Sequence, residues 1–192
     1  FTLLMLLIYR VGNVIPVPYV NTAALQSFFT QTLSNTVLGL YNAMSGSAFS
    51  RATVLALSIQ PYINASIIIQ LLTIAIPALE RMAKDEGEEG KKKINRITRY
   101  TTVGLGLLMG YGYYAMLKSY SMLTETGFLV GLVIVLAFTA GSAFVMWLGE
   151  QITEFGISNG ISMILFANII SSMPSAVNTL VSGLSAGSTK WY

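Results

Sequence analysis

The stretch that decides the fold runs from Met44 to Gln70 and reads MSGSAFSRATVLALSIQPYINASIIIQ. Small residues fill its first half, and Pro61 removes one backbone donor and disfavours helix at Gln60. The stretch therefore predicts a short helix followed by a separate spanning helix, with an ordinary proline kink as the alternative. Arg51 favours the break, because an arginine deep in a bilayer costs about 2.5–3.5 kcal/mol on insertion scales.

The composition around this stretch indicates a membrane protein. Of 192 residues, 54% are hydrophobic and 10% are charged, against about 25% charged residues in an ordinary soluble domain. The chain has neither cysteine nor histidine. It therefore lacks a thiol nucleophile, a cysteine-based metal site and the usual neutral-pH acid–base group. We expect no catalysed reaction, no metal site and no cofactor.

Runs of about 20 apolar residues, the length that crosses a bilayer as a helix, predict five membrane segments. We place them at 1–20, 58–79, 101–118, 127–148 and 161–181. The first run has no initiating Met and no signal-peptide pattern, and we interpret it as truncated at its start. The prolines at 16 and 18 are expected to end its helix.

Basic residues set the predicted orientation, because short loops rich in Lys and Arg face the cytoplasm. The loop 80–100 carries Arg81, Lys84, Lys91, Lys92, Lys93, Arg96 and Arg99. The loop 149–160 then faces the same side, and the linker 182–192 lies outside. The charge-free segment 21–43 is also external; it is too polar to span and favours a re-entrant or surface position. Backbone of that kind survives at membrane depth only against protein or a water-filled cavity, which a channel or transporter provides.

Several motifs resemble the SecY family of protein-conducting channels. FSRATVLALSIQPYINASIIIQLL (49–72) resembles the family's plug and second helix. MWLGEQITEFGISNGISMILFANII (146–170) resembles the junction of its fourth and fifth helices. IYRVGNVIPVP (8–18) is similar to the first helix, and GEEGKKKINRITRY (87–100) to the loop before the third. The matches occur in order over nearly the whole chain.

The resemblance implies an all-α integral membrane fold of five transmembrane helices with a broken second helix, which is one half of a pseudo-two-fold channel. A plug at 44–57 would seal the pore outside, with Ser45, Gly46, Phe49, Ser50, Arg51, Ala52 and Thr53. An aliphatic ring would seal it at mid-membrane, with Ile59, Ile63, Ile161 and Leu165. Each pair is spaced i, i+4 and can share one helix face, and a narrow apolar constriction blocks ions by dewetting. Asn64 matches a position near the lateral gate, while Met109 stands where some relatives have a polar side chain.

The same resemblance implies a passive conduit for secretory and membrane proteins in the bacterial inner membrane. Its partners would be SecE-like and SecG-like subunits, the SecA motor ATPase or a ribosome, the nascent polypeptide with its signal peptide, and membrane lipids. Lys91, Lys92, Lys93, Arg96 and Arg99 would contribute to the cytoplasmic docking face or contact anionic headgroups. The alternative is a fragment of a secondary transporter that moves a small solute, which would normally place an acid or histidine inside the membrane.

Overall fold

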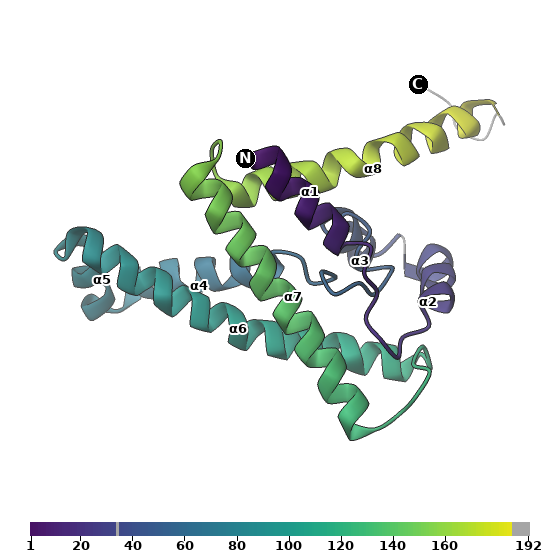
Figure 1. Ribbon diagram of the computed structural model, residues 1–192, viewed down its shortest axis with the longest axis horizontal. Coiled ribbons are helices and arrows are strands. Elements are labelled where there is room, and N and C mark those ends of the chain that lie inside the picture. Colours follow the sequence, from purple (N-terminus) through teal and green to yellow (C-terminus); the bar gives the residue numbers. More distant parts are fainter. Residues whose placement is uncertain (34, 186–192) are drawn as a thin grey trace.

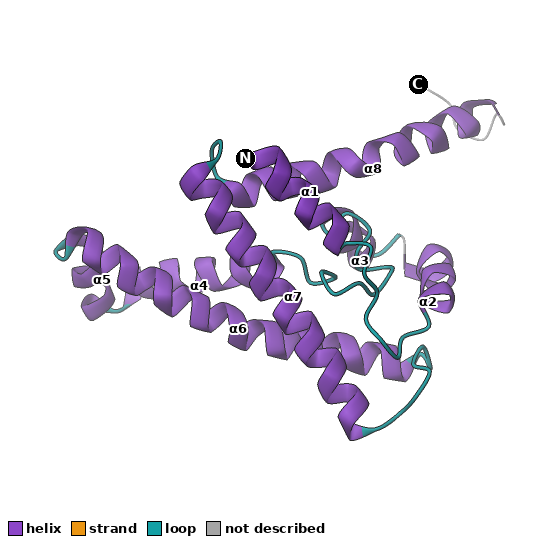
Figure 2. Ribbon diagram, viewed as in Figure 1, coloured by secondary structure: helices purple, strands orange, loops and turns teal. Residues whose placement is uncertain are grey.

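A computed structural model describes residues 1–33 and 35–185. Their regular structure is helical, and no strand occurs among them apart from two isolated bridges. Figure 1 shows the helices in chain order, and Figure 2 the loops that join them. The elements are α1 (Thr2–Gly12), α2 (Thr22–Phe28), the π-helix η1 (Phe29–Leu33), α3 (Val37–Met44), α4 (Gln60–Ala75), α5 (Pro77–Lys84), α6 (Gly87–Ser119), α7 (Phe128–Phe155) and α8 (Gly160–Ser185).

Two of the described helices, α7 and α8, are long and apolar enough to cross a membrane. The pair α4 and α5 passes the same test together but is bent by 102°, so that it is a broken span or a re-entrant loop. α1 is apolar but has 11 residues, fewer than a crossing needs. α6 is long, but glycine, threonine and tyrosine dilute its apolar residues. The structure therefore supports a helical membrane protein with two or three such spans, where the sequence predicted five.

The second predicted segment, 58–79, differs from the structure at both ends. Pro61 lies in the first turn of α4, where a missing backbone donor costs little. The helix ends early because Pro77 excludes its predecessor from the helical region: Ile76 has φ −108° and ψ 112°. Upstream, 45–59 forms successive turns, and the short helix expected there is absent. Gly46, Ser47, Ala52 and Ser58 all have positive φ, which interrupts a right-handed helix.

Helices also replace most of the predicted loops. α6 begins at Gly87, so the basic residues expected in a loop at 80–100 lie on helices α5 and α6. α7 continues to Phe155, which reduces the loop predicted at 149–160 to four residues. The segment 21–43, which was predicted to be external, folds as α2, η1 and α3. α1 ends at Gly12, before the prolines. α8 extends to Ser185, and the rest of the predicted linker lies outside the described residues.

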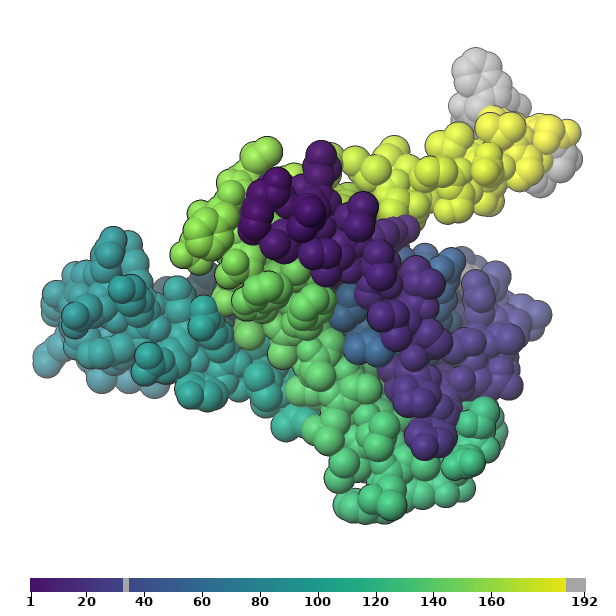
Figure 3. Space-filling model, in the orientation of Figure 1, coloured from purple at the N-terminus to yellow at the C-terminus, as the bar shows by residue number. Residues whose placement is uncertain are grey.

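Two apolar clusters form the core. One gathers α2, η1, α6 and α7 around Phe49, Tyr113 and Phe138. The other gathers α1, α4, α7 and α8 around Ile59 and Ile164. The loop 45–59, which we call the turn segment, contributes side chains to both clusters and runs through the middle of the molecule (Figure 2). The later part of α8 projects from this body, and its residues 173–182 are exposed (Figure 3).

Candidate functional site

The turn segment is irregular in backbone but almost fully buried. Its internal hydrogen bonds are short-range turns, such as Ala52 N–H to the Phe49 carbonyl at 3.2 Å and Ala56 N–H to Thr53 at 2.9 Å. Two further bonds tie it to the extended chain after α1. Val17 N–H donates to the Ala52 carbonyl, and Val54 N–H to that of Ile15, both at 3.0 Å. The segment is therefore held by its surroundings more than by its own secondary structure.

Aromatic side chains hold the middle of the segment against α3 and α6. Phe49 stacks on Tyr113 with ring centroids 4.6 Å apart, and it meets Tyr41 edge-on at 5.0 Å. The Tyr113 hydroxyl donates to the Phe49 carbonyl, and the Tyr41 hydroxyl donates to the Leu57 carbonyl at 3.2 Å. Each tyrosine thus satisfies a polar group of the segment while its ring packs in the apolar cluster.

A second anchor joins both ends of the segment to α1 and α8. Asn168 of α8 donates through Nδ2 to the Tyr9 hydroxyl and to the Met44 carbonyl, both at 2.9 Å. Tyr9 of α1 is 3.0 Å from the Ser58 hydroxyl. Asn168 and Tyr9 are each 1% exposed. The sequence reasoning missed this polar network, although a tyrosine and an asparagine inside apolar segments were its available signal.

α7 passes unusually close to the segment at Gly141. A Cβ atom added there would lie 1.9 Å from the Val54 carbonyl oxygen. No side chain fits in that space, so glycine at 141 permits the contact between helix and segment.

The predicted plug residues coincide with the buried part of the turn segment. Phe49 and Ser50 are each 6% exposed, and Arg51 alone of the set is exposed. The remaining members of the set are all buried: Ser45, Gly46, Ala52 and Thr53. Their burial follows from the two anchors, not from the helix that the sequence predicted.

The four predicted ring residues lie beside the second apolar cluster. Ile59 is 1% exposed and caps the start of α4, where its carbonyl accepts from Ile63 N–H at 3.1 Å. Ile59 and Ile161 both approach Gly149 of α7, and Ile59 and Leu165 line one small cavity. The structure therefore brings the four together, with Ile59 covered by its own neighbours and the other three partly exposed.

The predicted gate position, Asn64, faces α6. Its Nδ2 atom lies 4.0 Å from the Met109 sulfur. Thioether sulfur is a weak acceptor. This contact therefore joins α4 and α6 only weakly.

The basic residues at the start of α6 divide into two groups. Lys91, Lys92 and Arg96 are exposed with no ion pair among the described residues. Lys93 pairs with Glu86 at 2.6 Å, and this hydrogen bond raises the pKa of the Lys93 ammonium above its usual value.

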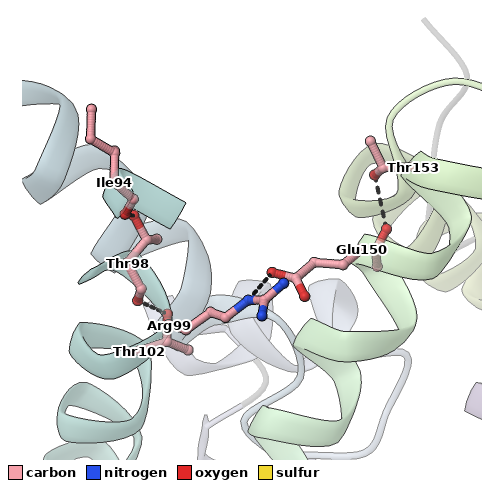
Figure 4. Close-up of polar contacts among 7 residues, drawn as sticks. Ile94, Thr98, Arg99, Thr102, Glu150 and Thr153 are labelled. Atoms are coloured by element: carbon pink, nitrogen blue, oxygen red, sulfur yellow. Dashed lines mark hydrogen bonds and ion pairs between the residues drawn. The ribbon is translucent and has the colours of Figure 1, made fainter. Parts of the chain in front are cut away.

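Arg99 makes the longer-range ion pair. Its Nε atom lies 2.9 Å from Glu150 of α7, and threonines bonded to backbone carbonyls flank the pair (Figure 4). Arg99 therefore links α6 to α7 through a partly exposed ion pair. A polar cavity of about 250 Å³ beside this pair also touches the predicted ring residue Ile161.

The described residues contain no cluster of acidic side chains, histidine or cysteine that could hold a metal ion. The buried, irregular turn segment lies where the two apolar clusters meet. The side chains of Tyr41, Tyr113 and Asn168 donate hydrogen bonds to backbone carbonyls of the segment and of Met44 just before it. These contacts hold the segment in place.

Comparison with known proteins identifies the family of the chain. The SecY family model matches residues 53–190. The protein translocase subunit SecY of Pseudomonas aeruginosa is 46% identical over 177 residues, which cover 92% of this chain and 40% of the relative. That of Aquifex aeolicus is 42% identical (92% and 42% covered), and that of Bacillus licheniformis 43% identical (94% and 42% covered). The chain spans about two fifths of the length of these relatives. It belongs to the SecY family.

Proposed function

We propose that this chain supplies one half of a channel that conducts unfolded secretory polypeptides across a membrane and releases transmembrane segments sideways into the bilayer. The relatives' name, protein translocase subunit, supports a role in protein transport. The observation that carries the proposal is the turn segment, which is irregular backbone buried between two helical cores. In a membrane protein, such backbone occurs against protein or along a water-filled path.

In this proposal the turn segment is the plug, and the aliphatic residues beside it form the narrow seal. Ile59, Ile63, Ile161 and Leu165 gather where α4, α7 and α8 meet, which would give an apolar collar when the other half of the channel faces them. Side chains of this kind exclude water and ions yet yield to a polypeptide. Asn64 would then lie near the gate through which apolar segments leave.

The finer assignments belong to the same proposal. α1, α4 and α6 would complete five membrane segments together with α7 and α8, and the basic start of α6 would face the cytoplasm. The channel would sit in the bacterial inner membrane and catalyse no reaction. SecE-like and SecG-like subunits, the SecA motor or a ribosome, and a nascent polypeptide with its signal peptide would be its partners. The energy for transport would come from the motor or from synthesis.

Single cysteines at the four collar positions test the proposal in the full-length protein, with any cysteines outside this chain replaced. A secretory polypeptide that carries one cysteine is stalled during transport, and disulfide formation with Ile59→Cys, Ile63→Cys, Ile161→Cys and Leu165→Cys is measured. The control is Val133→Cys on α7, an aliphatic position 40% exposed. We expect crosslinks at the collar and none at the control.

The opposite pattern would refute the collar. If none of the four cysteines reacts while crosslinks elsewhere show that the polypeptide is stalled in the protein, the path lies outside this face. The collar assignment would then be wrong, while the chain would still belong to the SecY family.

A further inference from the structure

The junction between α7 and α8 contains the one Asn–Gly dipeptide of the chain, Asn159–Gly160. In such a dipeptide the glycine nitrogen can attack the side-chain amide carbon of the asparagine, because glycine has no Cβ atom to hinder the approach. The attack expels ammonia and leaves a cyclic succinimide, which water opens to aspartate or isoaspartate. An Asn–Gly pair that is free to move is therefore chemically labile.

Helix packing requires the glycine of this pair. Gly160 is buried, and a Cβ atom added there would lie 2.0 Å from the Gly149 carbonyl oxygen and 2.9 Å from the Cβ atom of Ile152. No side chain fits in that space, so α8 can begin against α7 only with a glycine.

Helix capping favours the asparagine. Asn159 Oδ1 accepts a hydrogen bond from the Ile161 N–H at 3.0 Å, and the Asn159 carbonyl accepts from the Met163 N–H at 3.0 Å. Asparagine is among the preferred residues at this position of a helix. The labile pair thus follows from two structural requirements of the junction, one at each residue.

Both reacting groups are held in other hydrogen bonds. The Gly160 N–H donates to Thr153 Oγ1 at 2.9 Å, and the Thr153 hydroxyl donates in turn to the Gly149 carbonyl at 2.9 Å. Asn159 Oδ1 is directed to the Ile161 N–H. The attack requires the Gly160 nitrogen to lose its proton and face the Asn159 side chain, so these bonds must break first.

Burial does not protect the asparagine. Asn159 is exposed, and so are Ile157 and Ser158 before it. Ser158 has φ of +61°, a conformation that serine rarely adopts, and opening of the junction would relieve it. Water therefore reaches the junction, and the hydrogen bonds keep the two reacting groups apart.

We propose that Asn159 is a deamidation site that the Thr153 hydroxyl keeps unreactive in the folded protein. When the junction opens, the Gly160 nitrogen bonds to Cγ of Asn159 and the bond from Cγ to Nδ2 breaks. Nδ2 leaves as ammonia, which carries away the proton that the Gly160 nitrogen gives up. Water then adds to either carbonyl of the succinimide and yields aspartate or isoaspartate at position 159.

The two products differ in their effect on the junction. Aspartate keeps an oxygen for the Ile161 N–H, so the cap of α8 survives. Isoaspartate adds one methylene carbon to the main chain and moves Gly160 out of its place against Gly149. Ile161, which also lies against Gly149, would shift and loosen the collar. That last consequence rests on the proposed function, whereas the deamidation does not.

Deamidation of the full-length protein is followed at mildly alkaline pH by peptide mapping with mass spectrometry, which separates the three forms of residue 159. Thr153→Val removes the hydroxyl at nearly constant size, and Thr153→Ser keeps it. The control is Thr179→Val, which removes a hydroxyl bonded to its own helix at an exposed position of α8. Loss of the hydrogen bond to Gly160 should raise the open population, and with it the rate, about 2-fold to 13-fold in Thr153→Val. Thr153→Ser and Thr179→Val should react at the parent rate.

The protein unfolded in denaturant gives the reactivity of the dipeptide itself. All variants should then deamidate at one rate, which exceeds that of the folded parent. A variant that reaches this rate without denaturant has lost its fold, and Thr153→Ala, which is too small to clash, takes its place. The proposal is overturned if the folded parent reacts as fast as the unfolded chain, or if folded variants without the hydroxyl react as slowly as the parent.

Discussion

Replacement of Asn168 with leucine should loosen the turn segment from α8 without disturbing the packing around it. Asn168 is 1% exposed, and leucine has a similar shape and size. The change removes the two hydrogen bonds to Tyr9 and to the Met44 carbonyl. The contact between Tyr9 and Ser58 remains possible.

The size of the effect follows from the two lost bonds. Hydrogen bonds between membrane helices average about 0.6 kcal/mol each, which gives about 1.2 kcal/mol for the pair. The Met44 carbonyl, which is partly buried, loses its partner, and a fully buried carbonyl in that state costs about 1–3 kcal/mol, which sets the upper bound. The free energy of releasing the segment should therefore fall by about 1–3 kcal/mol. The released population should rise by the corresponding factor, about 5-fold to 150-fold.

A cysteine at Ser45 reports this release. The residue is 1% exposed and follows Met44 directly, and the chain has no cysteine of its own. When the segment recloses faster than a polar maleimide reacts, the alkylation rate is proportional to the open population. The rate of Ser45→Cys is compared in the parent, in Asn168→Leu and in Asn178→Leu, which makes the same change at an exposed position of α8.

Equal and slow alkylation of Ser45→Cys in the parent, in Asn168→Leu and in Asn178→Leu would refute this prediction. That result would mean that the polar network contributes nothing to holding the segment. Fast alkylation in the parent would refute a different step, the burial of the segment itself.

Three further results are expected. Gly141→Ala should destabilise the protein by about 1–3 kcal/mol or more through overpacking against the turn segment, whereas Gly112→Ala, which meets nothing within 4 Å, should be neutral or stabilising in thermal unfolding. A double-mutant cycle of Arg99→Gln and Glu150→Gln should give a coupling of about 0.2–1 kcal/mol, because the two side chains are 56% and 23% exposed. The pKa of Lys93 is raised from 10.5 by its ion pair with Glu86, so the pair contributes stability that is fully present below pH 10.5 and is lost as pH rises through the folded pKa. Amide hydrogen-exchange protection at the start of α6, corrected for the intrinsic exchange rate, should be constant between about pH 6 and 9 and fall at higher pH, whereas Lys93→Gln should lower the protection between about pH 6 and 9 and show no such fall.

The sequence predicted some boundaries of the fold because a local rule controls them. Pro61 placed the start of α4, and the long apolar runs located α7 and α8. The same proline rule applies at Pro77 and would have predicted the end of α4, but the apolar residues around it suggested a continuous segment. Charged composition indicated a solvent-exposed segment but did not fix its conformation. Lysine, glutamate and arginine occur in polar loops and are also good helix formers, and in the structure they continue α6 back to Gly87.

The candidate site was predictable only in outline. The resemblance implied a plug at 44–57, and the sequence predicted a short helix before the second spanning helix; the structure has the irregular turn segment 45–59 between α3 and α4 instead. Its anchors were not predicted, because Tyr9 and Asn168 meet across 159 positions of sequence. Such a contact depends on the crossing angle between α1 and α8, which no local sequence pattern specifies.

The balance between polar and apolar anchors bears on how the segment could leave its place. Phe49, Leu55, Leu57 and Ile59 are each at most 6% exposed, and burial of such a side chain is worth about 1.5–3 kcal/mol. Together they outweigh the hydrogen bonds of Asn168 several times over. Loss of the polar network alone therefore shifts the population without opening the segment outright. Release in the proposed channel must separate apolar contacts as well, and an entering apolar helix can replace those contacts whereas water cannot.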